Sequence, residues 1–419
     1  MFNIFFHKVM VLKKKLSQTL ERMFSLHPKL IDFDLSRLKF LMNKFGNPEN
    51  QLKNVIHIAG TNGKGSTASF LKEILEAHEL TVNVYTSPHL INFNERIRIR
   101  NKLISDELLI NILENIELEN KNKPITFFEI TTAAALIAFQ KYKSDFNIIE
   151  TGLGGRLDAT NIIDKKRLCI ITKIGFDHTE FLGKKIKQIA FEKSGILREN
   201  VPVIIAKQKY KDALETILDS ASKINAKVIN IENISASTKI GLNGNHQYEN
   251  ATSAYTAAKE LLPSISSLKT QEAFKKVSWH GRIEKVERGK IVKDRKNLTI
   301  LDGSHNQDGA YVLNQYLNQT PLLKWNLIIG MLNNRDIEAF VNIFKQHLNK
   351  AYAIAIPNID NSHKPKDISL KLNALGIETH PIKNLEEALR YSDKKMPLLI
   401  TGSLYLAGHV LKFNNTQIV

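Results

Sequence analysis

Short runs of β-branched and aliphatic residues alternate along the chain with longer stretches in which apolar residues recur at helical spacing. This alternation predicts an α/β fold with a mostly parallel sheet, because parallel strands need a crossover helix between them. Strand patterns in the first part of the chain lie at residues 55–59, 82–85, 146–150, 168–172, 203–206 and 227–231. Helical patterns lie at residues 68–77, 128–142, 186–197 and 213–223. These patterns do not give the order of the strands.

The alternation stops at residues 284–297, a charged and weakly patterned stretch that contains six lysines or arginines. It resumes with strand patterns at residues 298–301, 326–329, 351–356 and 398–401. We therefore predict a first domain at residues 1–290 and a second domain at residues 297–419. The second domain has the size of a compact Rossmann-like unit, and 419 residues are ample for two cores.

Composition indicates the class of protein and its compartment. Apolar residues make up 43% of the chain and charged residues 24%, as in an ordinary soluble globular protein. The one cysteine, Cys169, lies in an apolar run, so we expect a small buried side chain in a reducing compartment and no disulfide within the chain. His7 and Lys8 interrupt the apolar residues near the N-terminus, and no small-residue cleavage site follows, so export is not expected. No segment has the length of a membrane span, and we expect a cytoplasmic protein.

The formal net charge of +17 has two interpretations. Basic residues are spread along the whole chain, and aromatic residues are not interleaved with them as in a stacking platform for nucleic acid. A general bias of composition explains this pattern and concerns solubility more than function. The alternative is an acidic ligand, for which nucleotides and glutamates fit better than DNA. We expect no nucleic-acid or membrane partner and a chain that acts as a monomer.

The strongest chemical signal follows the first strand pattern. This segment consists of Gly60, Thr61, Asn62, Gly63, Lys64, Gly65, Ser66 and Thr67. Glycines allow backbone N–H groups to point at anionic oxygens, the following helix adds partial positive charge, and Lys64 can reach the outer phosphates of a nucleotide. The spacing departs from the common phosphate-loop pattern, because Ile58 stands at the place of the first glycine and Gly65 follows the lysine. A glycine-rich turn without a ligand is the alternative.

Two later strand patterns end in residues that suit a metal ion. One ends in Glu150 and is followed by a glycine-rich segment at residues 151–161, and the next leads to Asp177 and His178. Ligands of open α/β sheets bind outside the carboxyl ends of the strands, where Glu150 can serve as a magnesium ligand. A lone Asp-His pair in a loop is more often a capping feature, but two such strand ends after a phosphate loop favour a site.

These motifs resemble those of the bacterial bifunctional folylpolyglutamate synthases and dihydrofolate synthases, within the Mur ligase superfamily of ATP-dependent amide-forming ligases. The matching segments are residues 60–66, 86–90, 94–97, 126–129, 150–161, 177–179, 192–196, 246–247 with 250–251, 280–282, 302–306 and 401–406. The resemblance implies a P-loop ATPase domain with a mostly parallel sheet and a smaller Rossmann-like C-terminal domain. Two positions depart from the family pattern: Gln307 stands where proline is usual, and Arg335 where lysine is common, which changes the geometry of the charge.

The resemblance also implies a reaction. ATP would phosphorylate a carboxylate to an acyl phosphate, and the amine of L-glutamate would displace the phosphate. The acids would be dihydropteroate and then reduced folates, whose γ-carboxylate is extended. The implied cofactors are ATP, Mg²⁺ and a carbamylated lysine at Lys193.

Roles follow for individual residues from the same resemblance. Nucleotide contacts are implied for Gly60, Thr61, Asn62, Gly63, Lys64, Gly65, Ser66, Asn250, Arg282 and Asp302. Magnesium ligands are implied for Ser87, Glu150, His178 and the carbamylated Lys193. Pterin contacts are implied for Arg37, Thr86, Thr126, Phe127, Phe128, Glu129, Leu157, Asp158 and Ala159. The incoming glutamate is expected at His305 and Ser403, and the catalytic set is Lys64, Lys193 and His305.

Two other functions share part of these features. Another ligase of the superfamily, of the muramyl-peptide or cyanophycin type, should lack the segments at residues 126–129 and 401–406. A non-enzymatic nucleotide switch would bind ATP through the same loop without glutamate or a pteridine. Without the resemblance, Lys193 would be interpreted as a surface lysine, Arg282 as a charge at a domain boundary and Ser403 as a helix cap.

Overall fold

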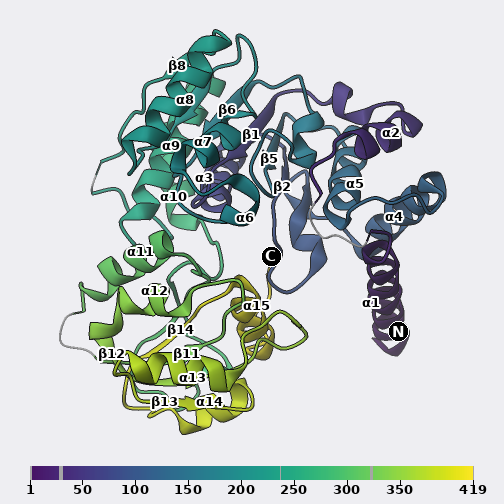
Figure 1. The fold of residues 1–419 in the computed structure, drawn as a ribbon. Coiled ribbons are helices and arrows are strands. Elements are labelled where there is room, and N and C mark those ends of the chain that lie inside the picture. The colour runs from purple at the N-terminus through teal and green to yellow at the C-terminus, as the bar shows by residue number, and fades with distance from the viewer. Residues whose placement is uncertain (1, 28–31, 236, 321–323, 419) are drawn as a thin grey trace.

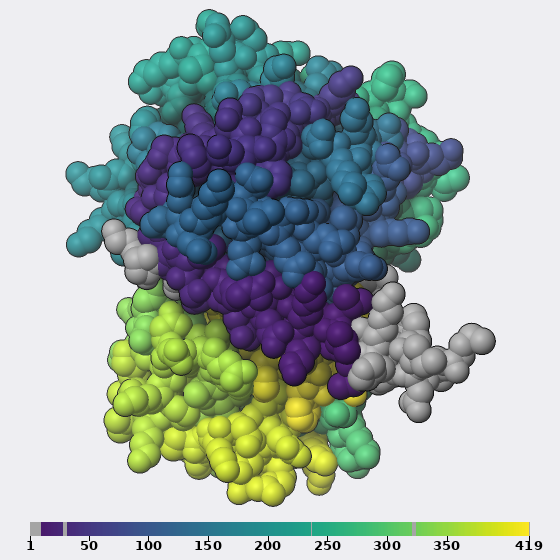
Figure 2. Space-filling view, turned by 90° about the vertical axis from the view of Figure 1, so that its right-hand side faces the viewer, coloured from purple at the N-terminus to yellow at the C-terminus, as the bar shows by residue number. Residues whose placement is uncertain are grey.

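The computed structural model describes residues 2–27, 32–235, 237–320 and 324–418. These residues form two largely parallel sheets with helices packed against them, which confirms the predicted α/β fold (Figure 1). We call residues 2–276 the first unit and residues 284–418 the second unit. In the space-filling view, the first unit fills the upper part and the second unit, in light green to yellow, fills the lower part (Figure 2). Within the described residues, no helix is both long and apolar enough to span a lipid bilayer.

The sheet of the first unit has the strand order β4-β3-β2-β5-β1-β6-β7-β8. Its strands are β1 (Val55–Ala59), β2 (Val82–Tyr85), β3 (Ile97–Ile99), β4 (Lys102–Leu103), β5 (Phe146–Glu150), β6 (Leu168–Ile171), β7 (Val203–Ile205) and β8 (Val228–Ile229). The pairings from β2 to β8 are parallel, whereas β3 and β4 add an antiparallel hairpin at one edge. The carboxyl ends of β1, β2, β5 and β6 therefore meet at one edge of the sheet.

Helices cover both faces of this sheet. One face carries α1 (Phe2–Phe24), α2 (Ser36–Lys44), α4 (Asp106–Asn120), α5 (Phe127–Lys141), α6 (Thr179–Leu182), α7 (Ile186–Ser194) and α8 (Lys211–Lys223). The other face carries α3 (Lys64–Ala77), α9 (His246–Leu261) and α10 (Ser267–Lys276). Alternate residues of a strand point to opposite faces, so Val55 belongs to the core under α5 and Ile56 to the core under α3.

The sheet of the second unit has the order β13-β12-β11-β14-β10-β9. Its strands are β9 (Glu284–Lys285), β10 (Thr299–Leu301), β11 (Trp325–Ile329), β12 (Leu348–Ala353), β13 (Thr379–Pro381) and β14 (Leu398–Thr401). The helices of this unit are α11 (Gln307–Leu317), α12 (Ile337–Asn342), α13 (Pro365–Ala374), α14 (Leu385–Tyr391) and α15 (Leu404–Phe413). All pairings are parallel except that of β9 with β10. The second sheet therefore begins at the start of the charged stretch at residues 284–297, and not at residue 298.

The predicted strands form, with small differences at their ends. Those expected at residues 55–59, 82–85, 146–150 and 398–401 are confirmed to the residue. The helix expected from residue 68 is wrong at its start, because α3 begins at Lys64, directly after Gly63 with its positive φ of 92°. The strand expected at residues 351–356 is wrong at both ends, because β12 runs from Leu348 to Ala353. Its start did not follow from the sequence, since the solvent-facing Asn349 breaks the apolar run.

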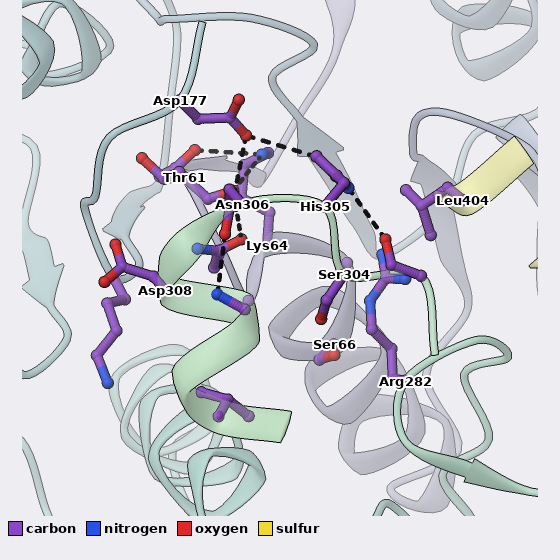
Figure 3. A pocket seen from close by; sticks show the side chains of 18 of the residues that line it. Thr61, Lys64, Ser66, Asp177, Arg282, Ser304, His305, Asn306, Asp308 and Leu404 are labelled. Carbon is purple, nitrogen blue, oxygen red and sulfur yellow. Dashed lines mark hydrogen bonds and ion pairs between the residues drawn. The ribbon is translucent and has the colours of Figure 1, made fainter. Parts of the chain in front are cut away.

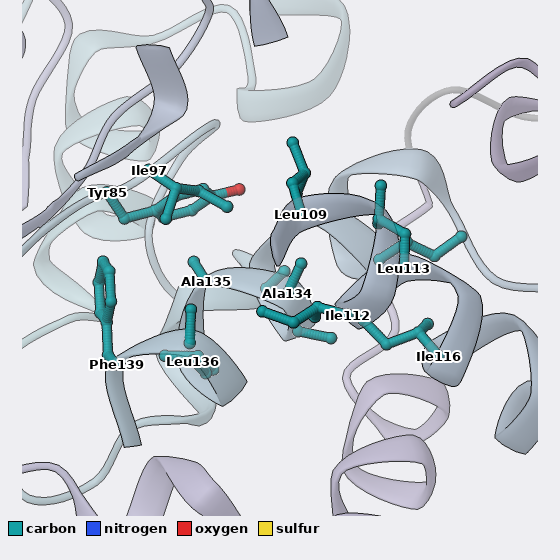
Figure 4. Close-up of a cluster of buried hydrophobic side chains, with 14 of the residues drawn as sticks. Tyr85, Ile97, Leu109, Ile112, Leu113, Ile116, Ala134, Ala135, Leu136 and Phe139 are labelled. Carbon is teal, nitrogen blue, oxygen red and sulfur yellow. The ribbon is translucent and has the colours of Figure 1, made fainter. Parts of the chain in front are cut away.

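The core under α5 holds α4 in place (Figure 4). We expect Leu113→Ala, which truncates a fully buried side chain of α4, to lower the free energy of unfolding by about 2–5 kcal/mol. Leu118 of the same helix is 71% exposed, so Leu118→Ala should change it by less than about 0.5 kcal/mol. Chemical denaturation of both variants measures the difference, and equal losses would contradict this packing.

Candidate active site

The loop between β1 and α3 has the geometry of an anion cradle. A Cβ at Gly63 would lie 2.4 Å from Oδ1 of Asn250, so the close approach of α9 requires glycine there. The first backbone N–H groups of α3 have no acceptor within the helix and can point at an anion. Among the described residues, the buried Oγ1 of Thr67 has no hydrogen-bond partner, so it too can serve a bound ligand.

The end of the neighbouring strand fixes this loop. The N–H groups of Thr61 and Asn62 donate to the carbonyl oxygen of Lys173 at 2.9 and 3.2 Å. The N–H of Gly175 donates to Oγ1 of Thr61 at 3.0 Å. Because β1 and β6 are parallel neighbours, the phosphate loop and the segment that leads to Asp177 form one continuous surface.

Two lysines converge on the carbonyl oxygen of Gly60. Nζ of Lys64 donates to it at 3.1 Å and Nζ of Lys193 at 2.8 Å. Lys193 lies on α7 and is buried, so it does not occupy the surface position that its sequence context alone suggests. Burial, followed by the charge of Lys64, lowers the pKa of Lys193 to about 7. A large fraction of this amine is therefore uncharged near neutral pH.

The residues predicted to bind magnesium come from three strand ends. Ser87 follows β2, Glu150 ends β5 and His178 precedes α6. The N–H of Ser87 donates to Oε2 of Glu150 at 3.4 Å, and burial raises the pKa of Glu150 to about 7, with Lys64 Nζ at 4.0 Å opposing the shift. Burial lowers the pKa of His178 to about 4, which leaves its imidazole neutral and able to coordinate a metal.

This donor set fits a divalent cation that also binds phosphate. A cation would compensate the buried carboxylate of Glu150, for which Lys64 is the nearest positive charge. Within the described residues, no three His, Cys, Asp or Glu side chains are grouped as metal ligands. The site therefore needs other oxygens, such as the Ser87 hydroxyl, phosphate oxygens or a carbamate on Lys193.

A cavity of about 220 Å³ gathers the predicted nucleotide and magnesium residues (Figure 3). Its lining from the first unit includes Gly60, Thr61, Asn62, Gly63, Lys64, Gly65, Ser66, Ser87, Glu150, His178, Lys193 and Asn250. Its lining from the linker and the second unit includes Arg282, Asp302 and His305. Each residue assigned to these two roles thus lies on the wall of one cavity between the units.

A second cavity, of about 340 Å³, gathers most residues predicted to bind the pterin. Those on its wall are Thr126, Phe128, Glu129, Leu157, Asp158 and Ala159, together with His305 and Ser403 from the second unit. The two cavities meet beside the predicted metal ligands, because they share Ser87, Pro88, Gly152, Leu153, His178, His305 and Leu404.

The predicted pterin residues Arg37, Phe127 and Thr86 are not on this wall. Phe127 packs against the rings of Phe24 and Phe93, with centroids 5.5 and 5.8 Å away. Thr86 lines a third cavity, next to Trp279, which shares Ser87 and Glu150 with the first cavity. Arg37 donates to Oε2 of Glu129 at 3.3 Å, so it contacts a residue of the wall without lining the cavity itself.

The segment at residues 126–129 is also a helix start. Oγ1 of Thr126 accepts from the N–H of Glu129 at 3.3 Å, and Oε2 of Glu129 accepts from the N–H of Thr126 at 2.8 Å, which forms a capping box for α5. Among the described residues, Oε1 of Glu129 is buried without a hydrogen-bond partner. This oxygen can accept an N–H group from a ligand in the second cavity.

Asp177 joins the two units at the mouth of the first cavity (Figure 3). Its carboxylate accepts a hydrogen bond from Nη1 of Arg335 and another from Nδ2 of Asn306 at 3.0 Å, and it lies 3.5 Å from Nε2 of His305. The side chain of Asp177 is only 9% exposed. Hydrogen bonding to His305 and the nearby charges lower the pKa of Asp177 far below its usual range despite its burial.

The role of Asp177 did not follow from the sequence. The chain pattern placed it beside His178 at a strand end, but its partners lie in the other unit and are 129 and 158 residues away. The sequence singled out Arg335 only as a departure from the family pattern and did not indicate Asp177 as its partner. Arg335 also lines the second cavity, along with Leu332 and Tyr405, which sequence reasoning did not identify as site residues.

Comparison with known proteins agrees with this geometry. Residues 58–219 match the family model for the Mur ligase middle domain, and residues 284–413 match the model for the C-terminal domain of dihydrofolate synthetase. The chain is 32% identical over 422 residues to the dihydrofolate synthase/folylpolyglutamate synthase of Bacillus subtilis, an alignment that covers 90% of this chain and 94% of that protein. It is 30% identical over 428 residues to the dihydrofolate synthetase of Saccharomyces cerevisiae, covering 93% of this chain and 99% of that protein.

Solved structures with the same fold contain nucleotides. Escherichia coli FolC in complex with DHPP and ADP superimposes with a TM-score of 0.85 at 26% identity, covering 95% of this chain and 97% of that chain. The bifunctional folylpolyglutamate synthase/dihydrofolate synthase of Yersinia pestis complexed with AMPPNP and a Mn ion gives 0.83 at 26% identity, with the same coverage.

The phosphate loop generates a prediction about nucleotide binding. Gly63→Ala should weaken binding of a non-hydrolysable ATP analogue by about tenfold or more, because the new methyl group meets Asn250 in a backbone conformation that alanine avoids. Gly46 also has a positive φ, of 74°, but a Cβ added there would have no atom within 4 Å, so Gly46→Ala is the matched control. Calorimetric titration compares the two, and a Gly63→Ala variant with normal affinity would contradict the cradle.

Proposed function

The chain belongs to the dihydrofolate synthase/folylpolyglutamate synthase family of ATP-dependent ligases, and we propose that it carries both activities of the bifunctional members. It joins L-glutamate to dihydropteroate and then to the γ-carboxylate of reduced folates. The observation that carries this proposal is the junction of two cavities at Ser87, His178 and His305. One cavity has a phosphate cradle, and the other has an apolar and acidic wall that suits a flat ring with N–H groups.

The two alternative functions have less support. Family models and relatives of matching length name dihydrofolate and folylpolyglutamate synthases, and the segments at residues 126–129 and 401–406 take part in the second cavity through Thr126 and Ser403. A nucleotide switch has no use for this second cavity. We also propose that one chain is the active unit, because one chain supplies every residue assigned to the nucleotide and to the metal.

In the proposed reaction, negative charge on the transferring phosphoryl group lies next to positive groups of the site. A carboxylate oxygen of the acid attacks the γ-phosphorus of ATP and ADP leaves, which yields an acyl phosphate. The amine of glutamate then attacks the acyl carbon, and phosphate leaves as the amide forms. Lys64 and the first N–H groups of α3 neutralise the oxygens of the transferring group, for which positioning and electrostatics suffice.

The second unit is proposed to present glutamate to the acyl phosphate. His305 lines both cavities, and Ser403 and Arg335 line the second one beside it. Nδ1 of His305 lies 3.0 Å from the carbonyl oxygen of Gly303, and Nε2 lies 3.5 Å from Asp177, so the ring is oriented from both sides. The guanidinium of Arg335 can supply a positive charge for a carboxylate of the amino acid.

A divalent cation is proposed at Ser87, Glu150 and His178. Related structures contain a nucleotide, and one of them a Mn ion. The cation would neutralise phosphate oxygens during transfer. Lys193 lies beside these residues on the wall of the first cavity, and a carbamate on its amine would convert a buried cation into an anionic ligand.

The function is tested with purified protein, MgATP and glutamate. We expect dihydrofolate and ADP in equal amounts when dihydropteroate is supplied, and a product larger by one glutamate when a reduced folate is supplied. Lys64→Met should fold normally, because methionine is unbranched and can replace the lysine stem at the start of α3, and it should lose about 10²–10³ in rate. Mass spectrometry identifies both products. A protein that makes dihydrofolate but never extends a reduced folate would be monofunctional, and near-normal Lys64→Met activity would refute the phosphate assignment.

Lys193 generates a prediction about carbon dioxide. Only the uncharged amine reacts with CO₂, and its fraction rises as the pH increases through about 7, the lowered pKa of Lys193. We expect Lys193→Ala to be nearly inactive and a short carboxylic acid in the buffer to restore part of the turnover by occupying the vacated anion site. Full activity of Lys193→Ala, or no response to any carboxylic acid, would count against the carbamate.

The contact between the units generates a prediction about Arg335. Arg335→Met leaves the buried Asp177 without its arginine, so kcat/KM for glutamate should fall by about tenfold or more. Lys209 also crosses between the units, to Asp308 at 3.0 Å, but its side chain is 45% exposed. Lys209→Met should therefore stay within about threefold of wild type. Equal effects of the two substitutions in steady-state kinetics would contradict a special role for the Asp177 contact.

A further inference from the structure

A buried histidine stands in the middle of the first sheet, outside both cavities. His57 is the central residue of β1, has no exposed surface and lies three residues before Gly60 of the phosphate loop. The proposed reaction does not use it. A buried polar ring in a parallel strand is costly unless it serves a hydrogen bond.

Among the described residues, the ring of His57 makes one hydrogen bond, which leads to the wall of the second cavity. Nε2 of His57 lies 2.8 Å from Oγ1 of Thr160, and Oγ1 of Thr160 donates to Oδ1 of Asp158 at 2.5 Å. All three side chains are buried. The threonine hydroxyl donates its one hydrogen to the carboxylate, so its oxygen accepts a hydrogen bond from Nε2–H of His57.

This direction defines the state of the imidazole. Nδ1 of His57 has no hydrogen-bond partner among the described residues, as expected of a neutral ring whose proton is on Nε2. Burial, followed by the charges of Lys166 and Arg198, lowers the pKa of His57 well below its usual value. The histidine is therefore a fixed donor and not a base.

Asp158 is the end of this chain of hydrogen bonds and a part of the second cavity. Besides Thr160 Oγ1, it accepts from the N–H of Leu153 at 2.8 Å and the N–H of Thr160 at 3.0 Å. The carboxylate thus ties together the two ends of residues 152–160. Gly152, Leu153, Leu157 and Ala159 of this segment also line the cavity, so the position of Asp158 sets the shape of that wall.

We propose that His57 is a positioning residue for the acid substrate, which acts through Thr160 to hold Asp158 as an oriented carboxylate in the wall of the second cavity. This inference rests on the proposed function, because it assumes that the second cavity holds the pterin part of the acid. The backbone of β1 is held by its pairing with β5 and β6, so a change at the His57 side chain leaves the phosphate loop in place. The effect should therefore appear in the binding of the acid and not of ATP.

The test compares variants that keep or remove the donor. His57→Leu removes it at similar size, whereas His57→Gln keeps an N–H donor near the position of Nε2. We expect His57→Leu to raise KM for dihydropteroate by about tenfold, with KM for ATP changed less than about twofold. His57→Gln should recover most of this loss. Asn147→Leu, which removes a buried polar side chain at the far end of β5, is the control for a general loss of stability.

A double-mutant cycle tests the relay itself. Thr160→Val removes the hydroxyl at nearly the same volume and should raise KM for dihydropteroate as His57→Leu does. Because both act through one chain of hydrogen bonds, the double variant should be no worse than either single variant. Additive effects would overturn the relay, and so would His57→Leu with a wild-type KM.

Nitrogen NMR of wild-type protein with labelled histidine keeps the inference testable if the variants fold poorly. We expect the His57 ring to be neutral, with its proton on Nε2, across the range of pH in which the protein is folded. A proton on Nδ1, or a charged ring at neutral pH, would overturn the inference. Failure of the proposed function is distinguishable, because wild-type protein would then form no dihydrofolate at all.

Discussion

The contacts of one carboxylate hold the two units of this protein in the arrangement that creates its site. Asp177 stands after β6 of the first unit and accepts hydrogen bonds from Asn306 and Arg335 of the second. These contacts help to fix His305 and Asp302 relative to the phosphate loop, together with the hydrogen bond from Asn306 to Asn62 and the ion pair between Lys209 and Asp308. The cost of burying Asp177 is offset by the donors around it, and a buried charge of this kind gives the interface a single geometry. Both cavities lie along that interface, so each depends on it.

The parallel sheet supplies the other half of the site by bringing polar residues to one edge. The strands β2, β5, β1 and β6 are neighbours, so Ser87, Glu150, Gly60 and Lys173 follow at adjacent strand ends. Burial then shifts the pKa values of the groups at this edge in opposite directions. The pKa of Glu150 rises to about 7 and that of Lys193 falls to about 7. Burial therefore disfavours the charged form of both groups at this edge of the sheet.

Much of this architecture could be predicted from the sequence, because buried parallel strands read as apolar runs. The strands at 55–59 and 146–150 were predicted to the residue. The strand order was not, since pairing is set by contacts between distant residues. Helices α1, α4 and α9 were not predicted by their apolar spacing.

The motif residues of the first cavity come together as expected. By contrast, Phe127, Thr86 and Arg37 do not line the second cavity. A motif predicts which backbone segment lies at the site, but the packing around the segment decides which of its side chains face the ligand. Phe127, for example, packs against the rings of Phe24 and Phe93.

The central claim is that one site between the two units holds nucleotide, metal and acid side by side. A crystal structure of the protein with magnesium, a non-hydrolysable ATP analogue and dihydropteroate tests it most directly. The account predicts the triphosphate along residues 60–66 with Lys64 at its outer phosphates, the metal on Ser87, Glu150 and His178, and the pterin against Asp158 and Glu129. A nucleotide bound elsewhere, or a pterin in the third cavity beside Trp279, would contradict it.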